Sequence, residues 1–362
     1  GIKNGTVVYD KFEFTEEPLP EERYSRSRKD LWVGDIPYPT TTIGSFPQTS
    51  EVRKTRKMLK EEQISDLEYE TFMKGYIKEC IRKQEELGID VLVHGEPERN
   101  DMVQYFAELL EGYTVIKSPV QSYGTRHVRP PVINGPVTRP KAMTVEWIKY
   151  AQSLTKKDVK AILTGPVTML HWAYPREDIS KEAQYYDIAK ALRDEVNDLA
   201  AAGIKHIQID EPALREGLPL DRSKREHYLK HAVNAFRMVF ADVPKDVVIH
   251  SHMCFSEFPD IMNAISDMGT DVLSIEDSKA KGKTSKALKS GGFPGSIGLG
   301  VYDVHSPRIP NVDEMTDIPS GLDMDPRKIW INPDCGLKTR GDEAYLQLER
   351  MMETTRRLRE NK

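Results

Sequence analysis

A histidine and a cysteine stand two residues apart in Ser251-His252-Met253-Cys254, a stretch that ends the apolar run 246–250. In an extended strand, side chains two residues apart point to the same face, so His252 and Cys254 would present an imidazole and a thiol together. These groups are two of the four ligands that a tetrahedral zinc site needs. A buried cysteine can also be a small apolar residue that binds no metal, so the pair alone does not decide.

Two further strand-like runs end in residues that could complete a metal site. One run ends at Glu276 and another at Cys335. Together with His252 and Cys254, they would supply the nitrogen, sulfur and oxygen ligands that Zn²⁺ binds in four-coordinate geometry. The four side chains fall at the ends of three separate expected strands, so we predict that they form one zinc site.

Strand-like segments alternate with helical patterns along most of the chain. Eight such segments are centred near residues 43, 92, 162, 208, 249, 274, 298 and 330, and each is followed by helical or irregular crossover sequence. Near-continuous apolar strands separated by helices are typical of parallel sheets covered on both faces. Eight of them favour an α/β fold of the (β/α)8 TIM-barrel type, with an open doubly wound sheet as the alternative.

Two segments fall outside this alternation. Residues 1–38 are rich in charge and proline, which indicates an N-terminal arm or linker, so we assign the barrel to residues 39–362. Near residues 113–140 the chain has short extended runs with proline and turn residues, which predict an antiparallel insertion in the barrel.

The carboxyl ends of the expected strands carry polar residues at seven of the eight positions. They are Ser45, Glu96, Asp210 with Glu211, His252 with Cys254, Glu276 with Asp277, Asp303 with His305, and Asp334 with Cys335. Chemistry in a barrel gathers at this end of the strands. The pattern therefore indicates one functional face.

The composition narrows the classes of partner. The 52 basic and 57 acidic residues give a formal net charge of −5, and no basic run could follow a phosphate backbone, so we do not expect nucleic acid as a partner. No apolar run approaches the roughly 18–20 residues that span a bilayer, so we expect no membrane insertion and a cytoplasmic protein. Three cysteines do not make a disulfide framework, and Cys80 stands at core spacing in a helical pattern.

Six motifs resemble the carboxyl-terminal catalytic domain of the cobalamin-independent methionine synthases, over nearly the whole chain from about residue 39. They are PTTTIGSFPQT at 39–49, HGEPERNDM at 94–102, DEPALREGLP at 210–219, HMC at 252–254, VYDVHSPR at 301–308 and NPDCGLKTR at 332–340. The resemblance implies a (β/α)8 catalytic barrel and a zinc ion. It also implies methyl transfer from 5-methyltetrahydrofolate, usually its triglutamate, to homocysteine, which gives methionine.

The resemblance also implies roles for individual residues. The zinc ligands would be His252, Cys254, Glu276 and Cys335. The homocysteine contacts would be Ile43, Ser45, Glu96 and Asp210. The folate contacts would be Arg126, His127, Trp172 and Glu216, and the proton donor would be His305.

These implied roles agree with the chemistry of the reaction. A thiol attacks as its thiolate, and zinc coordination would deprotonate the homocysteine thiol, which is mostly protonated at neutral pH. Glu96 and Asp210 would hold the substrate ammonium through charge-assisted hydrogen bonds, while Ser45 would take its carboxylate. His305 would protonate the leaving nitrogen of tetrahydrofolate as a general acid, and Trp172 would offer a flat face to the pterin ring.

Several alternatives stay open at this point. Long members of the family carry an additional amino-terminal barrel that helps to hold the folate tail, whereas some short members take the methyl group from a methylcorrinoid protein. A related zinc barrel could alkylate a different thiol, such as coenzyme M. A protein with a purely structural zinc ion is the non-catalytic alternative.

Overall fold

The structure is a computed structural model that describes residues 2–3, 6–7, 19, 34–116, 120–123, 126–254 and 259–361, with the backbone alone at 2–3, 6–7, 122–123, 126–127 and 259. Within these residues, seven parallel strands form one curled sheet in the order β13-β12-β11-β10-β9-β8-β3. The strands are β3 (Leu92–Val93), β8 (Val159–Thr164), β9 (His206–Asp210), β10 (Val248–Met253), β11 (Val272–Ile275), β12 (Ser296–Gly300) and β13 (Ile329–Asn332). They coincide with seven of the eight predicted strands.

The place of the first predicted strand is taken by the extended segment 39–46. Its start forms a parallel bridge to β13 (Thr40 with Ile331), and its end forms another beyond β3 (Ser45 with Gly95). The segment therefore joins the two outer strands of the sheet and closes it. This closure confirms the predicted (β/α)8 arrangement over the open doubly wound sheet.

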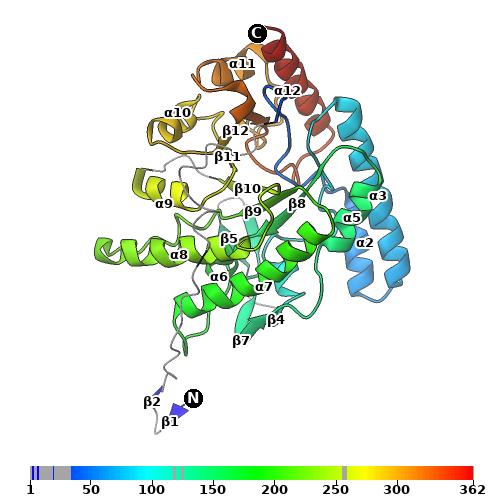
Figure 1. Cartoon of the computed structure of the whole chain (residues 1–362). Coiled ribbons are helices and arrows are strands. Elements are labelled where there is room, and N and C mark those ends of the chain that lie inside the picture. Colours follow the sequence, from blue (N-terminus) through cyan, green and yellow to red (C-terminus); the bar gives the residue numbers. More distant parts are fainter. Residues whose placement is uncertain are drawn as a thin grey trace.

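Helices cover the outside of the curled sheet (Figure 1). They are α2 (Ser50–Lys60), α3 (Asp66–Leu87), α4 (Gln104–Ala107), α5 (Val145–Ser153), α6 (Pro166–His171), α7 (Lys181–Ala201), α8 (Arg225–Val239), α9 (Met262–Asp267), α10 (Lys283–Ser290), α11 (Val312–Ser320) and α12 (Glu343–Glu360). In the long helix α3, residues that favour helix caps explain where the helix begins and ends. Ser65 and Glu68 form a capping box at its start, and Gly88 ends it in the left-handed conformation at φ +84°.

The predicted antiparallel insertion is present between α4 and α5. Strand β4 (Glu111–Thr114) pairs with β7 (Val132–Thr138), and β5 (Gln121–Tyr123) pairs with β6 (Arg126–Val128). Near the amino terminus, the two-residue strands β1 (Ile2–Lys3) and β2 (Thr6–Val7) pair antiparallel. Most of the predicted arm over residues 1–38 lies outside the described residues, so the boundary between arm and barrel stays a prediction.

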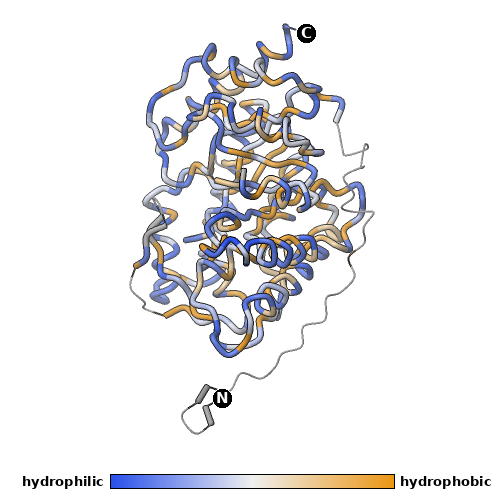
Figure 2. The backbone as a smooth tube through the Cα atoms, turned by 90° about the vertical axis from the view of Figure 1, so that its left-hand side faces the viewer, coloured by the Kyte–Doolittle hydropathy of each residue, from blue (hydrophilic) through white to orange (hydrophobic). Residues whose placement is uncertain are grey.

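The interior of the barrel holds polar side chains together with a small apolar cluster of Val91, Val248, Val272 and Trp330, whereas the layer between the strands and the helices is apolar. Outward-facing residues such as Ile207 and Leu273 belong to the main apolar core, and Figure 2 shows the hydrophobic strands grouped in the middle of the molecule. Inward-facing side chains make contacts across the barrel. Gln208 Nε2 donates to the Ile43 carbonyl at 2.8 Å, and the rings of His250 and Trp330 meet edge to face at 5.1 Å.

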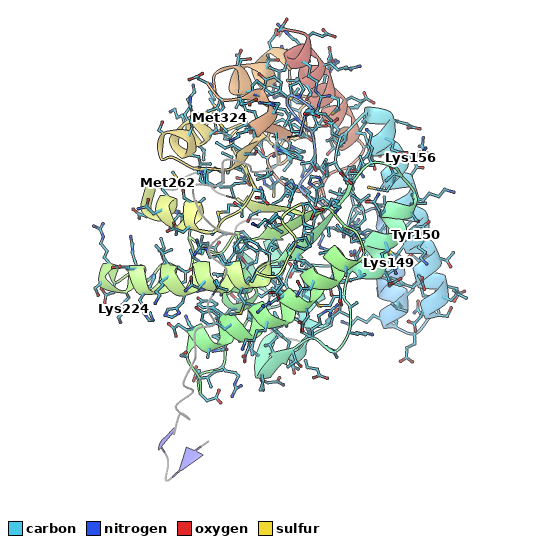
Figure 3. The ribbon with its side chains drawn as sticks, viewed as in Figure 1. Lys149, Tyr150, Lys156, Lys224, Met262 and Met324 are labelled. Carbon is cyan, nitrogen blue, oxygen red and sulfur yellow. The ribbon has the colours of Figure 1, made fainter. Side chains whose placement is uncertain are left out.

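Charged side chains cover the outer surface. Lys149, Lys156 and Lys224 are exposed and extend from the periphery of the molecule (Figure 3). In the part of the chain that the structure describes, no helix is both long enough and apolar enough to cross a membrane.

Candidate metal and substrate site

Three potential metal ligands meet at the carboxyl ends of β10 and β13. His252 Nε2 lies 3.2 Å from Cys254 Sγ, and the Cys254 and Cys335 sulfurs lie 3.6 Å apart. All three ligand atoms lie within 4.8 Å of one another. Strands β10 and β13 are separated by two strands in the sheet, so the curl of the sheet brings the second cysteine to the first pair.

The local contacts orient this group for metal binding. His252 Nδ1 lies 3.2 Å from the carbonyl oxygen of Ser274, which can only accept, so Nδ1 carries a proton and Nε2 faces the sulfurs. A hydrogen bond from Cys254 holds the pKa of Cys335 well below its usual value, and the charge of His252 acts in the same direction. Burial opposes protonation of His252, but the hydrogen bond and charge of Cys335 raise its pKa to about 9.

Glu276 lies beside the group without joining it. Its carboxylate is not among the ligand atoms that lie within 4.8 Å of one another. Burial and the negative charge of Cys335 raise the pKa of Glu276 to about 7, while His252 opposes this shift. Glu276 directly follows β11, which is the neighbour of β10 in the sheet, and its role as the fourth ligand stays a prediction.

Residues predicted to bind homocysteine surround the same group. Asp210, at the end of β9, accepts a hydrogen bond from the backbone N–H of His252 at 3.1 Å and another from Gln208 Nε2 at 3.2 Å. Ser45 lies against Gly336, because a Cβ atom on that glycine would collide with Ser45 Oγ. Since Gly336 follows Cys335, the segment 39–46 that closes the barrel (the closing segment) lies against the loop that carries Cys335.

Glu96 faces the closing segment because its backbone adopts an unusual conformation. Its φ angle is +58°, in the left-handed region that a non-glycine residue seldom adopts. Its carboxylate occupies the space where a Cβ atom on Gly44 would lie. Arg99 Nη1 lies 3.8 Å from Glu96 Oε1 and keeps a positive charge beside it. Glycine at position 44 is therefore required for Glu96 to face the closing segment.

The residues predicted to bind folate are placed in part. Trp172 is buried, and its Nε1–H donates to Glu216 Oε2 at 2.9 Å, so these two form one unit. Arg126 and His127 lie in β6, and their side chains fall outside the described part of the structure. His305 is exposed on the loop after β12, so its predicted role as proton donor is not tested by a contact.

Comparison with known proteins assigns the family. The family described as "Cobalamin-independent synthase, Catalytic domain" matches residues 38–357. The chain belongs to this family. A relative from Chelativorans sp. (strain BNC1) is 55% identical over 348 residues, which are 95% of this chain and 45% of that protein. A relative from Lactococcus lactis is 52% identical over 355 residues, which are 97% of this chain and 46% of that protein.

Both relatives are named 5-methyltetrahydropteroyltriglutamate–homocysteine methyltransferase. The chain spans about half the length of the curated relatives it matches. Among solved structures, a B12-independent methionine synthase from Shewanella sp. W3-18-1 aligns with a TM-score of 0.73 at 20% identity, over 90% of this chain and 99% of that one. A putative vitamin-B12 independent methionine synthase from Listeria monocytogenes aligns with a TM-score of 0.72 at 18% identity, over 88% and 96% of the two chains. These alignments support the barrel fold.

In this member of the cobalamin-independent synthase family, Glu211 has a positioning role that sequence reasoning did not assign. Its carboxylate accepts from the backbone N–H groups of Val167 and Thr168 at 2.9 and 2.8 Å, at the start of α6. Burial raises the pKa of Glu211 to about 7. Because Trp172 directly follows α6, Glu211 anchors the helix that carries this tryptophan. In the sequence, the position of Glu211 next to Asp210 at a strand end is the feature that could have indicated this role.

Asp334 is a second positioning residue of this kind in the family member described here. Asp334 Oδ1 accepts from the backbone N–H groups of Asp277 and Ser278 at 3.0 and 3.1 Å. It therefore ties the loop after Glu276 to the loop that carries Cys335.

Proposed function

We propose that this chain catalyses zinc-dependent methyl transfer from 5-methyltetrahydrofolate, as its polyglutamate, to the thiol of L-homocysteine, which yields L-methionine. The observation that carries this proposal is the position of the His252, Cys254 and Cys335 group, directly beside the carboxylate of Asp210 at one end of the barrel. The names of the relatives support the choice of donor and acceptor.

The donor set of the metal group fits zinc. Two thiols and one imidazole within 4.8 Å of one another are the ligands that Zn²⁺ prefers in tetrahedral sites. His252, Cys254 and Cys335 would hold the ion, and Glu276 would supply the fourth ligand. Zinc bound here would act as a Lewis acid that lowers the pKa of the substrate thiol.

The closing segment and two carboxylates would bind the amino-acid part of homocysteine. Glu96 and Asp210 would accept hydrogen bonds from its ammonium, which favours an amino acid over a thiol such as coenzyme M. Ser45 would donate to its carboxylate, and Ile43 would contact its aliphatic part. These contacts beside the metal group also argue against a purely structural metal, which needs no substrate pocket.

The methyl donor would bind against the Trp172 and Glu216 unit. Trp172 would pack on the pterin ring, and Glu216 would accept from a ring N–H group. Arg126 and His127 remain predicted contacts of the same ligand. His305 would donate a proton to the nitrogen that loses the methyl group, because an unprotonated amide-like anion leaves poorly.

Other parts of the proposal concern the context of the enzyme. The comparisons give no support to a methylcorrinoid donor. A further amino-terminal barrel as a partner for the folate tail and a cytoplasmic location remain predictions.

Methionine formation tests the proposed function. Zinc-loaded protein is given homocysteine with 5-methyltetrahydropteroyltriglutamate, and a parallel sample receives methylcobalamin in place of the folate. We expect methionine from the folate and a loss of activity after zinc removal that returned zinc restores. Methionine from methylcobalamin alone would overturn the folate as donor, and no methionine in either sample would overturn the activity of this chain.

A further inference from the structure

Lys160 is a lysine in the interior of the barrel. It is the second residue of β8, it is 0% exposed, and its Nζ donates to the carbonyl oxygen of Thr42 at 2.8 Å. Strand β3 lies between β8 and the closing segment 39–46, so this hydrogen bond crosses the interior. Lysines elsewhere, such as Lys149 and Lys224, have their side chains at the surface (Figure 3). A fully buried ammonium is costly, so a specific role must compensate for it.

Lys160 belongs to an interior network beside the predicted homocysteine contacts. Burial lowers the pKa of Lys160 to about 7, and the charges of Asp210 and Glu96 oppose that shift. Gln208 is part of the same network, because its Nε2 donates to the Ile43 carbonyl at 2.8 Å and to Asp210 Oδ2 at 3.2 Å. The segment 39–46 and Asp210 are therefore held from inside the barrel by the same group of side chains.

Lys160 also holds the middle of the closing segment. Bridges to neighbouring strands fix this segment at Thr40 and Ser45, and the Thr41 N–H donates to the Ile331 carbonyl at 3.2 Å. Between Thr41 and Ser45, Lys160 Nζ donates to the carbonyl of Thr42, and Gln208 Nε2 donates to the carbonyl of Ile43 at 2.8 Å. Two interior side chains therefore set consecutive peptide groups that lead directly into the pocket.

We propose that Lys160 is a positioning residue for the amino-acid part of homocysteine. It holds the closing segment in place through the Thr42 carbonyl, and this sets Ile43 and Ser45 for contact with the substrate. This inference rests on the proposed function, because it takes Ile43 and Ser45 as contacts of homocysteine.

Calorimetric binding to the zinc-loaded protein tests the role of Lys160. The ligands are homocysteine and 3-mercaptopropylamine, which is the same molecule without the carboxyl group that Ser45 would bind. We expect Lys160→Met to weaken homocysteine binding by about tenfold or more, as is typical when a buried charged hydrogen bond is lost, and to weaken binding of 3-mercaptopropylamine by less than about threefold. The KM for homocysteine should rise in parallel, with little change in kcat.

Lys157→Met is the matched control. Lys157 stands three residues earlier, just before the start of β8, and also donates to a backbone carbonyl, that of Ile89. This variant should bind both ligands as the wild type does. Lys160→Gln, which keeps a donor, serves as the second variant and should weaken homocysteine binding less than Lys160→Met does.

Three results would overturn the proposal for Lys160. They are an unchanged Kd for homocysteine, an equal weakening of both ligands, and a failure of both variants to fold, which would give Lys160 a purely structural role. A wild-type protein that binds homocysteine but forms no methionine would overturn the proposed function instead, and it would leave this binding test intact.

Discussion

The sulfurs of Cys254 and Cys335 illustrate how a metal site depends on single side chains. They lie 3.6 Å apart without a disulfide, and both are free cysteines. The two thiols share one proton in effect, since the pKa of Cys335 is lowered by the hydrogen bond from Cys254, and the pKa of Cys254 is raised by the same contact. A divalent metal ion would replace that proton and relieve the repulsion between two thiolates.

Replacement of either cysteine should therefore remove the metal. We expect Cys254→Ser and Cys335→Ser to lose stoichiometric zinc, because a serine hydroxyl stays protonated and is a poor zinc ligand. Zinc content per chain, measured by plasma mass spectrometry after dialysis, checks this. Cys80→Ser is the control, since Cys80 lies in α3 and is bound by Gln84 instead. Full zinc content in Cys335→Ser would contradict the assignment.

At the scale of elements, the closing segment and the loop after β3 fit together without space for a side chain at position 44. A Cβ atom on Gly44 would collide with Glu96 Oε1 and with Ile162 Cδ1, and the backbone there has φ +153°. The position of the Glu96 carboxylate therefore depends on how closely the closing segment packs against the loop after β3.

Gly44→Ala should displace Glu96 and lower kcat/KM for homocysteine by about 100-fold, because small misplacements of binding groups have large effects on rate. We also expect a loss of about 1–3 kcal/mol in the free energy of unfolding from steric strain. Steady-state kinetics and urea unfolding measure the two effects.

Gly75→Ala is the matched control for this glycine. Gly75 lies inside helix α3, and a Cβ atom there would meet no atom within 4 Å. Alanine should therefore stabilise the protein by about 0.5–1 kcal/mol and leave the kinetics unchanged. If Gly44→Ala and Gly75→Ala had the same kcat/KM and the same free energy of unfolding, the clash at position 44 would have no effect.

Helices α6, α7 and α8 meet around the half-buried His171. His171 Nε2 lies 2.6 Å from the Tyr185 hydroxyl, and its ring packs edge to face on Tyr228 at 5.9 Å. Burial lowers the pKa of His171 to about 4 from 6.5, with a smaller contribution from Lys181. The folded state therefore favours the neutral imidazole.

This shift predicts how stability depends on pH. Between pH 6.5 and 4 the unfolded chain binds a proton at this position and the folded chain does not, so acid favours unfolding. The free energy of unfolding should fall by about 2 kcal/mol from pH 7 to pH 5 through this group. Urea unfolding of the wild type and His171→Gln at both pH values isolates the contribution. If the free energy of unfolding depended on pH in the same way in both proteins, His171 would make no such contribution.

At the scale of the whole molecule, the last helix secures the start of the barrel. Arg359, near the end of α12, donates to the carbonyl groups of Pro37 and Tyr38 and to Asp90, at 2.9, 2.9 and 2.7 Å. Asp90 also accepts from the backbone N–H of Thr40 at 2.8 Å. One arginine thus links the end of the described chain to the segment that closes the sheet.

Arg359→Met should lower the free energy of unfolding by about 1.5–3 kcal/mol, because it leaves Asp90 and two carbonyl groups without this donor. Arg356→Met, on the exposed side of the same helix, should change it by less than about 0.5 kcal/mol. Urea unfolding compares the two. If both variants were equally stable, barrel closure would not depend on this contact.

The metal group and most strands could be predicted from the sequence because their signals are local. Apolar runs mark β8 to β13, and His252 with Cys254 share a face by the two-residue period of a strand. Family motifs identified Ile43, Ser45 and Asp210, and the structure brings these residues to the same end of the barrel. The short helix α6 was not predicted, because six residues carry too little periodicity to show a helix.

Only the tertiary structure decided which polar residues support the site. Lys160 and Thr42 are 118 residues apart in the chain, and Glu211 lies 44 residues from the helix start that it binds. Such pairs have no signal in local sequence, since a lysine or glutamate near an apolar run is ordinarily exposed. Their partners are set by barrel closure, which places strands from opposite ends of the chain around one interior. The sequence by itself therefore determined the chemical groups of the site, and the fold determined which partners hold them in place.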